Sequence, residues 1–123
     1  AASIHRPDIL VIDHLQNMGN SLDNRAQELS VLIRDIHELA RKDKKMAVMM
    51  VAQFNRMAEQ EPMSLRHYKD CGKIDEEGAI CIGFEWIDRS AEGDILQMRV
   101  MKNRFGKIGK ADLRFNGETG GLE

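Results

Sequence analysis

The first half of the chain contains two uninterrupted apolar runs, separated by a longer stretch in which apolar residues recur periodically. The runs are Ile9–Ile12 and Met46–Ala52. Between them, apolar residues from Leu22 to Ala40 return every three or four positions, which is typical of an amphipathic helix of about five turns. Four consecutive branched aliphatic residues favour a strand covered on both faces, as at the centre of a parallel sheet. Strand, helix and strand in this order predict one crossover unit with two parallel strands.

The second half of the chain is more polar and carries more glycine. Residues 57–73 are charged and include Pro62, so we expect a long loop with at most a short helical turn. Later apolar segments are shorter and are separated by a glycine-containing turn, as in an antiparallel hairpin. The predicted elements are a short strand over Ala79–Phe84, hairpin strands over Ile95–Met101 and Ala111–Phe115, and a turn-rich tail over residues 116–123 that is free to fray.

Composition narrows the class of protein. A chain of 123 residues holds one modest core, so we expect a single domain. Its net charge of −2 supplies no global basic field, so any contact with nucleic acid has to be local. Cys71 and Cys81 are too few for a zinc site or a disulfide framework and indicate reduced thiols in a cytoplasmic protein. His14, His37 and His67 lack metal-ligand spacing, and we expect each on a helix surface or half-buried. No apolar run approaches the ~18 residues of a membrane helix, so no membrane association is expected.

Polar side chains follow both predicted parallel strands. Asp13 comes directly after the first run and Gln53 after the second. The carboxyl ends of parallel strands are where an open α/β sheet presents ligand-binding groups. A carboxylate there suits Mg²⁺ beside phosphates, and a neutral amide can bond a phosphate or an attacking water. The alternatives are an acid that ends a strand or caps a helix and a plain polar strand terminus.

The sequence contains no G-x-x-x-x-G-K-[ST], the loop whose backbone amides cradle phosphate. The first predicted strand also begins within about ten residues of the start, so the 123 residues are typical of the second half of a larger unit.

Two cations near the C-terminus form a further candidate site. Lys102 and Arg104 are two residues apart, so on an extended strand they point to the same side. Paired cations suit a polyphosphate whose charge builds up in a transition state. The alternative is a solvated hairpin edge, where lysines discourage strand pairing.

Several segments, taken in order, resemble motifs of one protein family. Residues 8–16 (DILVIDHLQ) resemble its Walker B strand, with His14 in place of the usual tyrosine. Residues 52–56 (AQFNR) resemble its Ser-Gln-Leu-Asn-Arg signature, and residues 68–79 (YKDCGKIDEEGA) resemble the segment around its DNA loop. Residues 101–106 (MKNRFG) and 113–117 (LRFNG) resemble its closing segments. Together they make the chain similar to the C-terminal half of the RecA-like motor domain of replicative DnaB-type hexameric DNA helicases.

The resemblance implies an α/β fold, namely part of a RecA-like (P-loop NTPase) domain with a long crossover helix and a C-terminal hairpin. It implies ATP and Mg²⁺ as cofactors, with Asp13 contacting Mg²⁺ through water and Gln53 acting as the γ-phosphate sensor. It also implies a hexameric ring in which Lys102 and Arg104 reach the ATP of the adjacent subunit. The glutamate that activates water would lie upstream. Such proteins occur in the cytoplasm of bacteria or are encoded by phages or plasmids.

The resemblance further implies a loop that holds single-stranded DNA through backbone amides and a basic side chain. The alternative is an ordinary surface loop. Two departures weaken this site, because a lysine replaces the usual arginine and loses its bidentate fork, and Cys71 replaces a serine. The loop residues are Lys69, Asp70, Cys71 and Gly72.

Two other functions compete with half of a helicase motor. A truncated RecA-like fragment acting as an assembly module would associate through its hairpin and open sheet edge. A RecA-like recombinase or clock-type ATPase fits residues 53–56 and 69–72 less well. Because the phosphate-binding loop is lacking, we expect the 123-residue polypeptide alone to hydrolyse no ATP.

Overall fold

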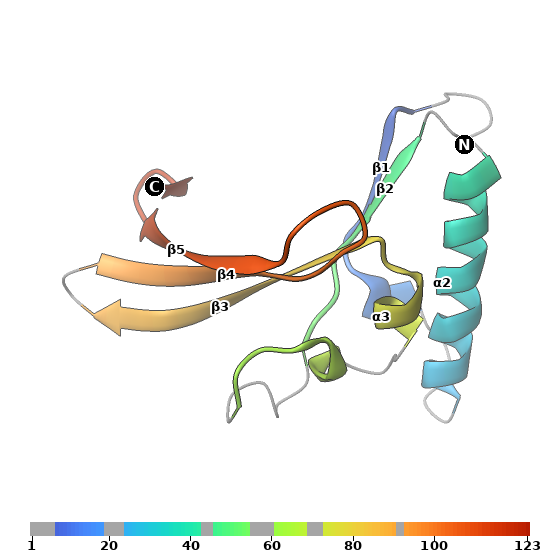
Figure 1. Ribbon diagram of the computed structural model, residues 1–123, viewed down its shortest axis with the longest axis horizontal. Helices are drawn as coiled ribbons and strands as arrows, with labels where there is room; N and C mark the ends of the chain where they lie inside the picture. Colours follow the sequence, from blue (N-terminus) through green and yellow to red (C-terminus); the bar gives the residue numbers. More distant parts are fainter. Residues whose placement is uncertain (1–6, 19–23, 43–45, 55–60, 69–72, 91–92) are drawn as a thin grey trace.

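The computed structural model describes residues 7–18, 24–42, 46–54, 61–68, 73–90 and 93–123. Strand β1 (Ile9–Ile12) pairs in parallel with β2 (Ala47–Met50), and Ile9 lies opposite Ala47. Helix α2 (Arg25–Lys42) connects them and lies beside the pair (Figure 1). The predicted parallel crossover is therefore confirmed, and 18 helical residues make the expected five turns.

One apolar cluster holds this unit together. Leu29 and Ile33 from α2 are fully buried against Leu15 of the short 3-10 helix η1 (Leu15–Met18). Ile74 of α3 (Lys73–Glu77) completes the cluster, and Met50 and Ala52 pack against it. On the surface, His37 Nδ1 lies 2.5 Å from a Glu77 carboxylate oxygen and ties α2 to α3.

The expectation that the first strand is covered on both faces is wrong for the residues that the structure describes. Ile9 is 61% exposed and Val11 is 57% exposed, whereas Leu10 and Ile12 are half-buried. Met49 of β2 is exposed in the same way. The reason is that β1 and β2 form a single two-stranded layer, and the apolar cluster with α2 covers only one of its faces.

The second sheet is antiparallel, has the order β3-β4-β5-β6 and extends away from α2 (Figure 1). The predicted hairpin is confirmed, since β4 pairs with β5. The prediction that β3 ends at Phe84 is wrong, because this strand continues through polar residues to Ser90 and pairs with β4 over that part as well. The tail is a closed turn rather than a fraying end, because Phe115 lies opposite Leu122. The strand bounds are β3 Ile80–Ser90, β4 Gly93–Asn103, β5 Gly109–Asn116 and β6 Gly121–Leu122.

The two faces of this sheet differ in chemistry. The register places Ile82 opposite Val100, Phe84 opposite Met98 and Trp86 opposite Leu96, and we call these six residues the apolar face. On the other face, Gln97 Nε2 donates to Asp112 Oδ1 at 2.8 Å. The three β3 members of the apolar face are 39–49% exposed, so this face is only partly covered by the described residues.

A small apolar junction connects the two sheets. Phe54, just beyond β2, forms an isolated antiparallel bridge with Tyr68, and their ring centroids are 5.0 Å apart. Gly83 of β3 approaches the same place closely, because a Cβ built on it would lie 2.9 Å from Phe54 Cζ and 3.1 Å from Met101 Cε.

The segment predicted as a loop over residues 57–73 is described only in part. Its residues 61–68 include the expected helical turn, η3 (Leu65–His67). Its last residue, Lys73, already belongs to α3. Residues 57–60 and 69–72 lie outside the described ranges.

Among the described residues, no helix is both long enough and apolar enough to cross a membrane.

Candidate nucleotide and DNA site

Asp13 and Gln53 leave neighbouring strands at the same end of the parallel pair. Backbone bonds continue past the strands, with Val51 N–H donating to Ile12 O at 2.9 Å and Leu15 N–H donating to Val51 O at 2.8 Å. Asp13 lies within this pairing, and Gln53 follows two residues after Val51. The peptide bond between Asp13 and His14 is cis.

The carboxylate of Asp13 is accessible. Its side chain is 75% exposed, and its Oδ1 lies 3.9 Å from His14 Nδ1. Within the described residues, no group of three or more His, Cys, Asp and Glu side chains gathers as a metal cage. A single accessible carboxylate suits Mg²⁺, because this ion is usually bound through one or two carboxylates and keeps several waters.

Lys102 and Arg104 converge on the end of α3. Lys102 Nζ donates to the carbonyl oxygens of Asp75 and Glu76, the latter at 3.2 Å. Arg104 Nη2 donates to the same Glu76 oxygen at 2.8 Å. These are C-terminal carbonyls of a helix, which lack intrahelical partners and carry partial negative charge. The two cations thus share one side, and they reach back to their own chain.

The four predicted DNA-loop residues, Lys69, Asp70, Cys71 and Gly72, lie outside the described residues. Their preceding neighbour is anchored, because Tyr68 packs on Phe54 and is bridged to it. Burial raises the pKa of the Tyr68 phenol to about 12. Tyr68, the residue before the predicted loop, therefore lies beside Phe54, the residue that follows Gln53.

His67 was expected on a surface or half-buried, and that expectation is wrong. It is only 1% exposed, and both of its ring nitrogens are engaged. Ser64 N–H donates to His67 Nδ1 at 3.1 Å, and His67 Nε2 lies 3.3 Å from Glu61 Oε2. Ser64 and His67 are three residues apart, the spacing of a capping box, and this spacing is a local sequence signal for their contact but not for the burial of the ring.

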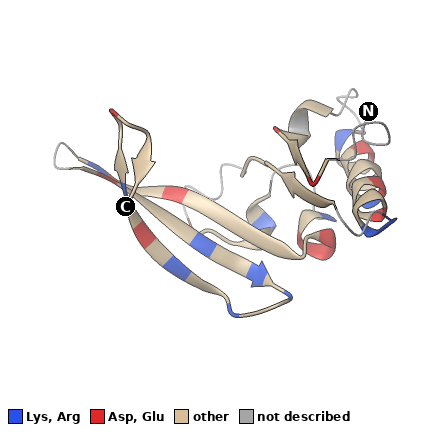
Figure 2. Ribbon diagram, turned by 90° about the horizontal axis from the view of Figure 1, so that it is seen from above, with Lys and Arg blue, Asp and Glu red and all other residues tan. Residues whose placement is uncertain are grey.

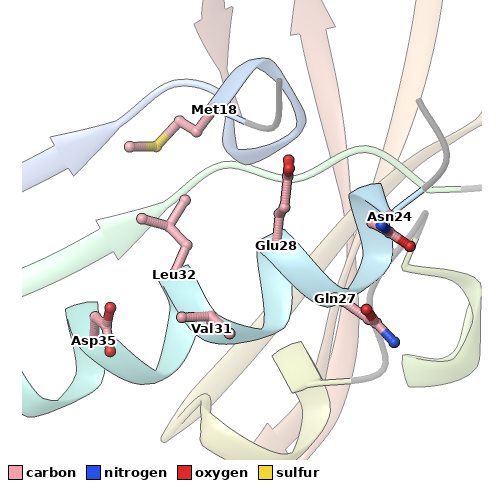
Figure 3. A pocket seen from close by; sticks show the side chains of 7 residues that line it. All are labelled: Met18, Asn24, Gln27, Glu28, Val31, Leu32 and Asp35. Atoms are coloured by element: carbon pink, nitrogen blue, oxygen red, sulfur yellow. The ribbon is translucent and has the colours of Figure 1, made fainter. Parts of the chain in front are cut away.

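A separate hollow of about 540 Å³ lies between η1 and α2 (Figure 3). Glu28 and Leu32 rise from α2 towards η1, which carries Met18. None of the predicted site residues lines it, and it offers carboxylates rather than cations, so it does not suit phosphate. Its lining residues are Met18, Asn24, Gln27, Glu28, Val31, Leu32 and Asp35.

Comparison with known proteins decides the family. A family model described as the DnaB-like helicase C terminal domain matches residues 1–123. The chain belongs to this family. The DnaB-like resemblance of the motifs is thereby confirmed, and the recombinase and clock-type ATPase alternatives are set aside.

Two curated relatives are similar to this DnaB-like chain. They are the replicative DNA helicase DnaC of Bacillus subtilis (strain 168) and the replicative DNA helicase DnaB of Geobacillus stearothermophilus. Each is 29% identical over 119 residues, which cover 87% of this chain. The chain spans 26% of the length of either relative.

Solved structures share the fold. One is the structure of a DnaB-like replicative helicase and its interactions with primase, with a TM-score of 0.79 and 25% identity. Another is a separately solved ATPase domain, with a TM-score of 0.79 and 24% identity. Each match covers 93% of this chain, and the matched parts are 29% and 43% of those chains. The α/β class expected from the sequence is confirmed.

Proposed function

We propose that this chain is the C-terminal part of the motor domain of an ATP-dependent replicative DNA helicase. The helicase assembles into a hexameric ring and acts in the cytoplasm of a bacterium, or it is encoded by a phage or plasmid. The observation that carries the proposal is the family match over the whole chain. Its support from geometry is that Asp13 and Gln53 leave adjacent parallel strands at one end.

In this proposal, Asp13 helps to hold Mg²⁺ through water, and ATP with Mg²⁺ supplies the phosphoryl chemistry when bound. An exposed carboxylate suits an ion that keeps most of its water shell. Gln53 bonds the γ-phosphate or the attacking water through its amide, which is able both to donate and to accept. The residues Lys69, Asp70, Cys71 and Gly72 track single-stranded DNA through its backbone, which suits a motor because phosphate contacts bind every sequence alike.

Lys102 and Arg104 serve the ATP of an adjacent subunit in this proposal. Their bonds to α3 carbonyls hold both side chains on one side of the strand. Each bond uses only some of the donors, since an ammonium has three N–H groups and a guanidinium has five. The remaining donors are available for phosphate oxygens.

The test is the magnesium-dependent ATPase activity of the full-length protein that carries this domain. We expect Asp13→Asn to lower kcat by about 100-fold or more, because a metal contact contributes several kcal/mol to the transition state. The matched control is Asp8→Asn, which removes an exposed carboxylate at the opposite end of the same strand and is expected to leave activity unchanged. Equal rates for the two variants would contradict the role of Asp13.

A second candidate is favoured by the partly uncovered apolar face of the large sheet. The 123-residue polypeptide alone would then act as a non-catalytic assembly module that associates through this face. The gene sequence upstream of Ala1 distinguishes the two candidates. A reading frame that continues upstream into a Gly-Lys-Thr/Ser loop supports the motor, and a start codon beside Ala1 supports the module. Turnover of ATP by the isolated polypeptide, abolished by Asp13→Asn, would exclude the module.

A further inference from the structure

A groove of about 650 Å³ separates the polar side of the large sheet from η3 and α3. It takes basic side chains from three different segments: Arg66 from η3, Arg99 from β4 and Lys110 from β5. Asp75 is the acidic side chain in its lining. Basic and acidic residues both occur along the strands of the large sheet, as Figure 2 shows. None of the residues assigned above to nucleotide or DNA lies in it.

The floor of the groove contains a like-charge pair. Arg99 and Lys110 are directly opposite each other in the antiparallel ladder of β4 and β5. Side chains in such positions are close neighbours on one face, and like charges there destabilise a sheet. The partner of Arg99 on its other side is Gly83, which contributes no compensating charge.

The structure provides little neutralisation for this pair. Within the described ranges, neither Arg99 nor Lys110 has an acidic partner within 4.0 Å. Arg99 Nη2 donates to Gln97 Oε1 at 2.9 Å, and that neutral bond aims the guanidinium along the sheet. Arg99 Nε is buried and lacks a hydrogen-bond partner among the described residues. By contrast, Arg66 is already paired with Glu61.

We propose that this groove, floored by Arg99 and Lys110, binds the sugar-phosphate backbone of single-stranded nucleic acid. The inference rests on the proposed helicase function and adds a contact site to it. The charge of the pair is complementary to phosphodiesters, and apolar Ile108, which is 66% exposed, offers a surface for sugars and bases. A duplex is stiff over many base pairs, whereas a single strand is able to follow a groove of this size.

The position of the groove agrees with this ligand. Arg66, on its wall, lies three residues before Lys69, which begins the predicted DNA loop. The groove wall and the predicted DNA loop are therefore close in sequence. Binding through phosphates predicts affinity without sequence preference and with strong dependence on salt.

The experiment measures the dissociation constant of the full-length protein for a fluorescent oligo-dT strand over a range of salt concentrations. The test variant is Arg99→Gln with Lys110→Gln, and the control is Arg34→Gln with Lys42→Gln, two exposed cations of α2. Both carry the same change in net charge. We expect the test variant to weaken binding about tenfold and to reduce the magnitude of the salt slope by about 1.4, at about 0.7 for each lost phosphate contact on a single strand.

Additional variants keep the test decisive. Arg99→Lys with Lys110→Arg retains both charges and is expected to bind as the unaltered protein does. Lys110→Glu changes one exposed side chain, and it is expected to weaken binding even if the double variant fails to fold.

The outcomes separate this inference from the function on which it rests. If the unaltered protein binds oligo-dT and the test and control variants lose affinity equally, or not at all, the groove proposal is overturned while the helicase proposal stands. If the test variant raises the KM for ATP and leaves DNA affinity unchanged, the groove takes nucleotide instead and the proposal is likewise overturned. If the unaltered protein binds no single strand, both proposals fail.

Discussion

At the scale of single residues, the cluster of Glu61, Arg66 and His67 fixes the segment that enters the predicted DNA loop. Glu61 is paired with Arg66 and lies 3.3 Å from the buried His67. The hydrogen bond from His67 and the charge of Arg66 hold the pKa of Glu61 below its usual value. The carboxylate therefore stabilises this segment when it is ionised.

This cluster gives a pH-dependent prediction. Because the pKa of Glu61 is lowered by folding, its contribution is complete above the usual value of about 4.5 and is lost as pH falls through the lowered value. Glu61→Gln is expected to speed amide exchange in residues 61–68 at pH 6.5, and the difference from the unaltered protein is expected to shrink as pH falls through the lowered pKa of Glu61. Hydrogen-exchange mass spectrometry over a series of pH values measures both. Equal exchange at pH 6.5, or a difference that stays constant as pH falls, would count against it.

The sequence placed Asp13 and Gln53 at the ends of parallel strands because each directly follows an aliphatic run, and strand ends are local features. It could not place His67, since the burial of that ring depends on where η3 packs rather than on its own neighbours. Nor could it find that Lys102 and Arg104 cap α3, because the contacts join residues 26–28 positions apart. The alternation of residues along a strand indicates on which face of the strand a side chain lies. The contacts that the side chain makes depend on tertiary packing.

At the scale of elements, the junction of Phe54, Tyr68 and Gly83 sets how the large sheet meets the parallel pair. A Cβ built at position 83 would lie 3.1 Å or less from side-chain atoms of Met63, Phe54 and Met101, so these side chains would have to shift to admit it. Met63, which is 2% exposed, fills the same space and has little room to move. The sequence showed Gly83 inside an apolar run, yet the glycine carries no signal of which neighbours require it.

We expect Gly83→Ala to destabilise the domain by about 1–3 kcal/mol, the usual cost of overpacking a filled core. The matched substitution is Gly109→Ala in β5 of the same sheet, where an added Cβ meets nothing within 4 Å. It is expected to change stability by less than about 0.5 kcal/mol. Urea denaturation of the full-length variants, followed by tryptophan fluorescence, compares them, since Trp86 lies in β3. A loss of stability at Gly109 as large as at Gly83 would refute the account of the junction.

Some of the helices and strands were predicted from the sequence and others were not. The helix and both parallel strands followed from periodicity and aliphatic runs. The second half of β3 was not predicted because residues 85–90 are largely polar and five of them are exposed. Backbone pairing with β4, rather than burial of side chains, stabilises this part of the strand. The bulges near Cys81 and Trp86 also interrupt the alternation that would have revealed the strand.

At the scale of the whole molecule, the chain exposes more surface than its mass requires. Its accessible area is 9082 Å², whereas a compact monomer of 14.0 kDa is expected to expose about 6,700 Å². Part of the exposed surface is apolar, since Ile9 and Val11 of β1 and the β3 residues of the apolar face are exposed. Both sheets therefore have surfaces suited to further protein.

The 123-residue polypeptide on its own is accordingly expected to self-associate. Burial of the exposed side chains of the apolar face in a dimer removes apolar area from water on both copies, which favours association. Phe84→Lys is expected to shift the polypeptide towards monomer in analytical ultracentrifugation. Glu85→Lys, its neighbour on the opposite face of β3, is expected to leave the distribution unchanged. Sedimentation of the unaltered polypeptide as a monomer at tens of micromolar would show that its open faces are tolerated in water, and the surface excess would then carry no information about assembly.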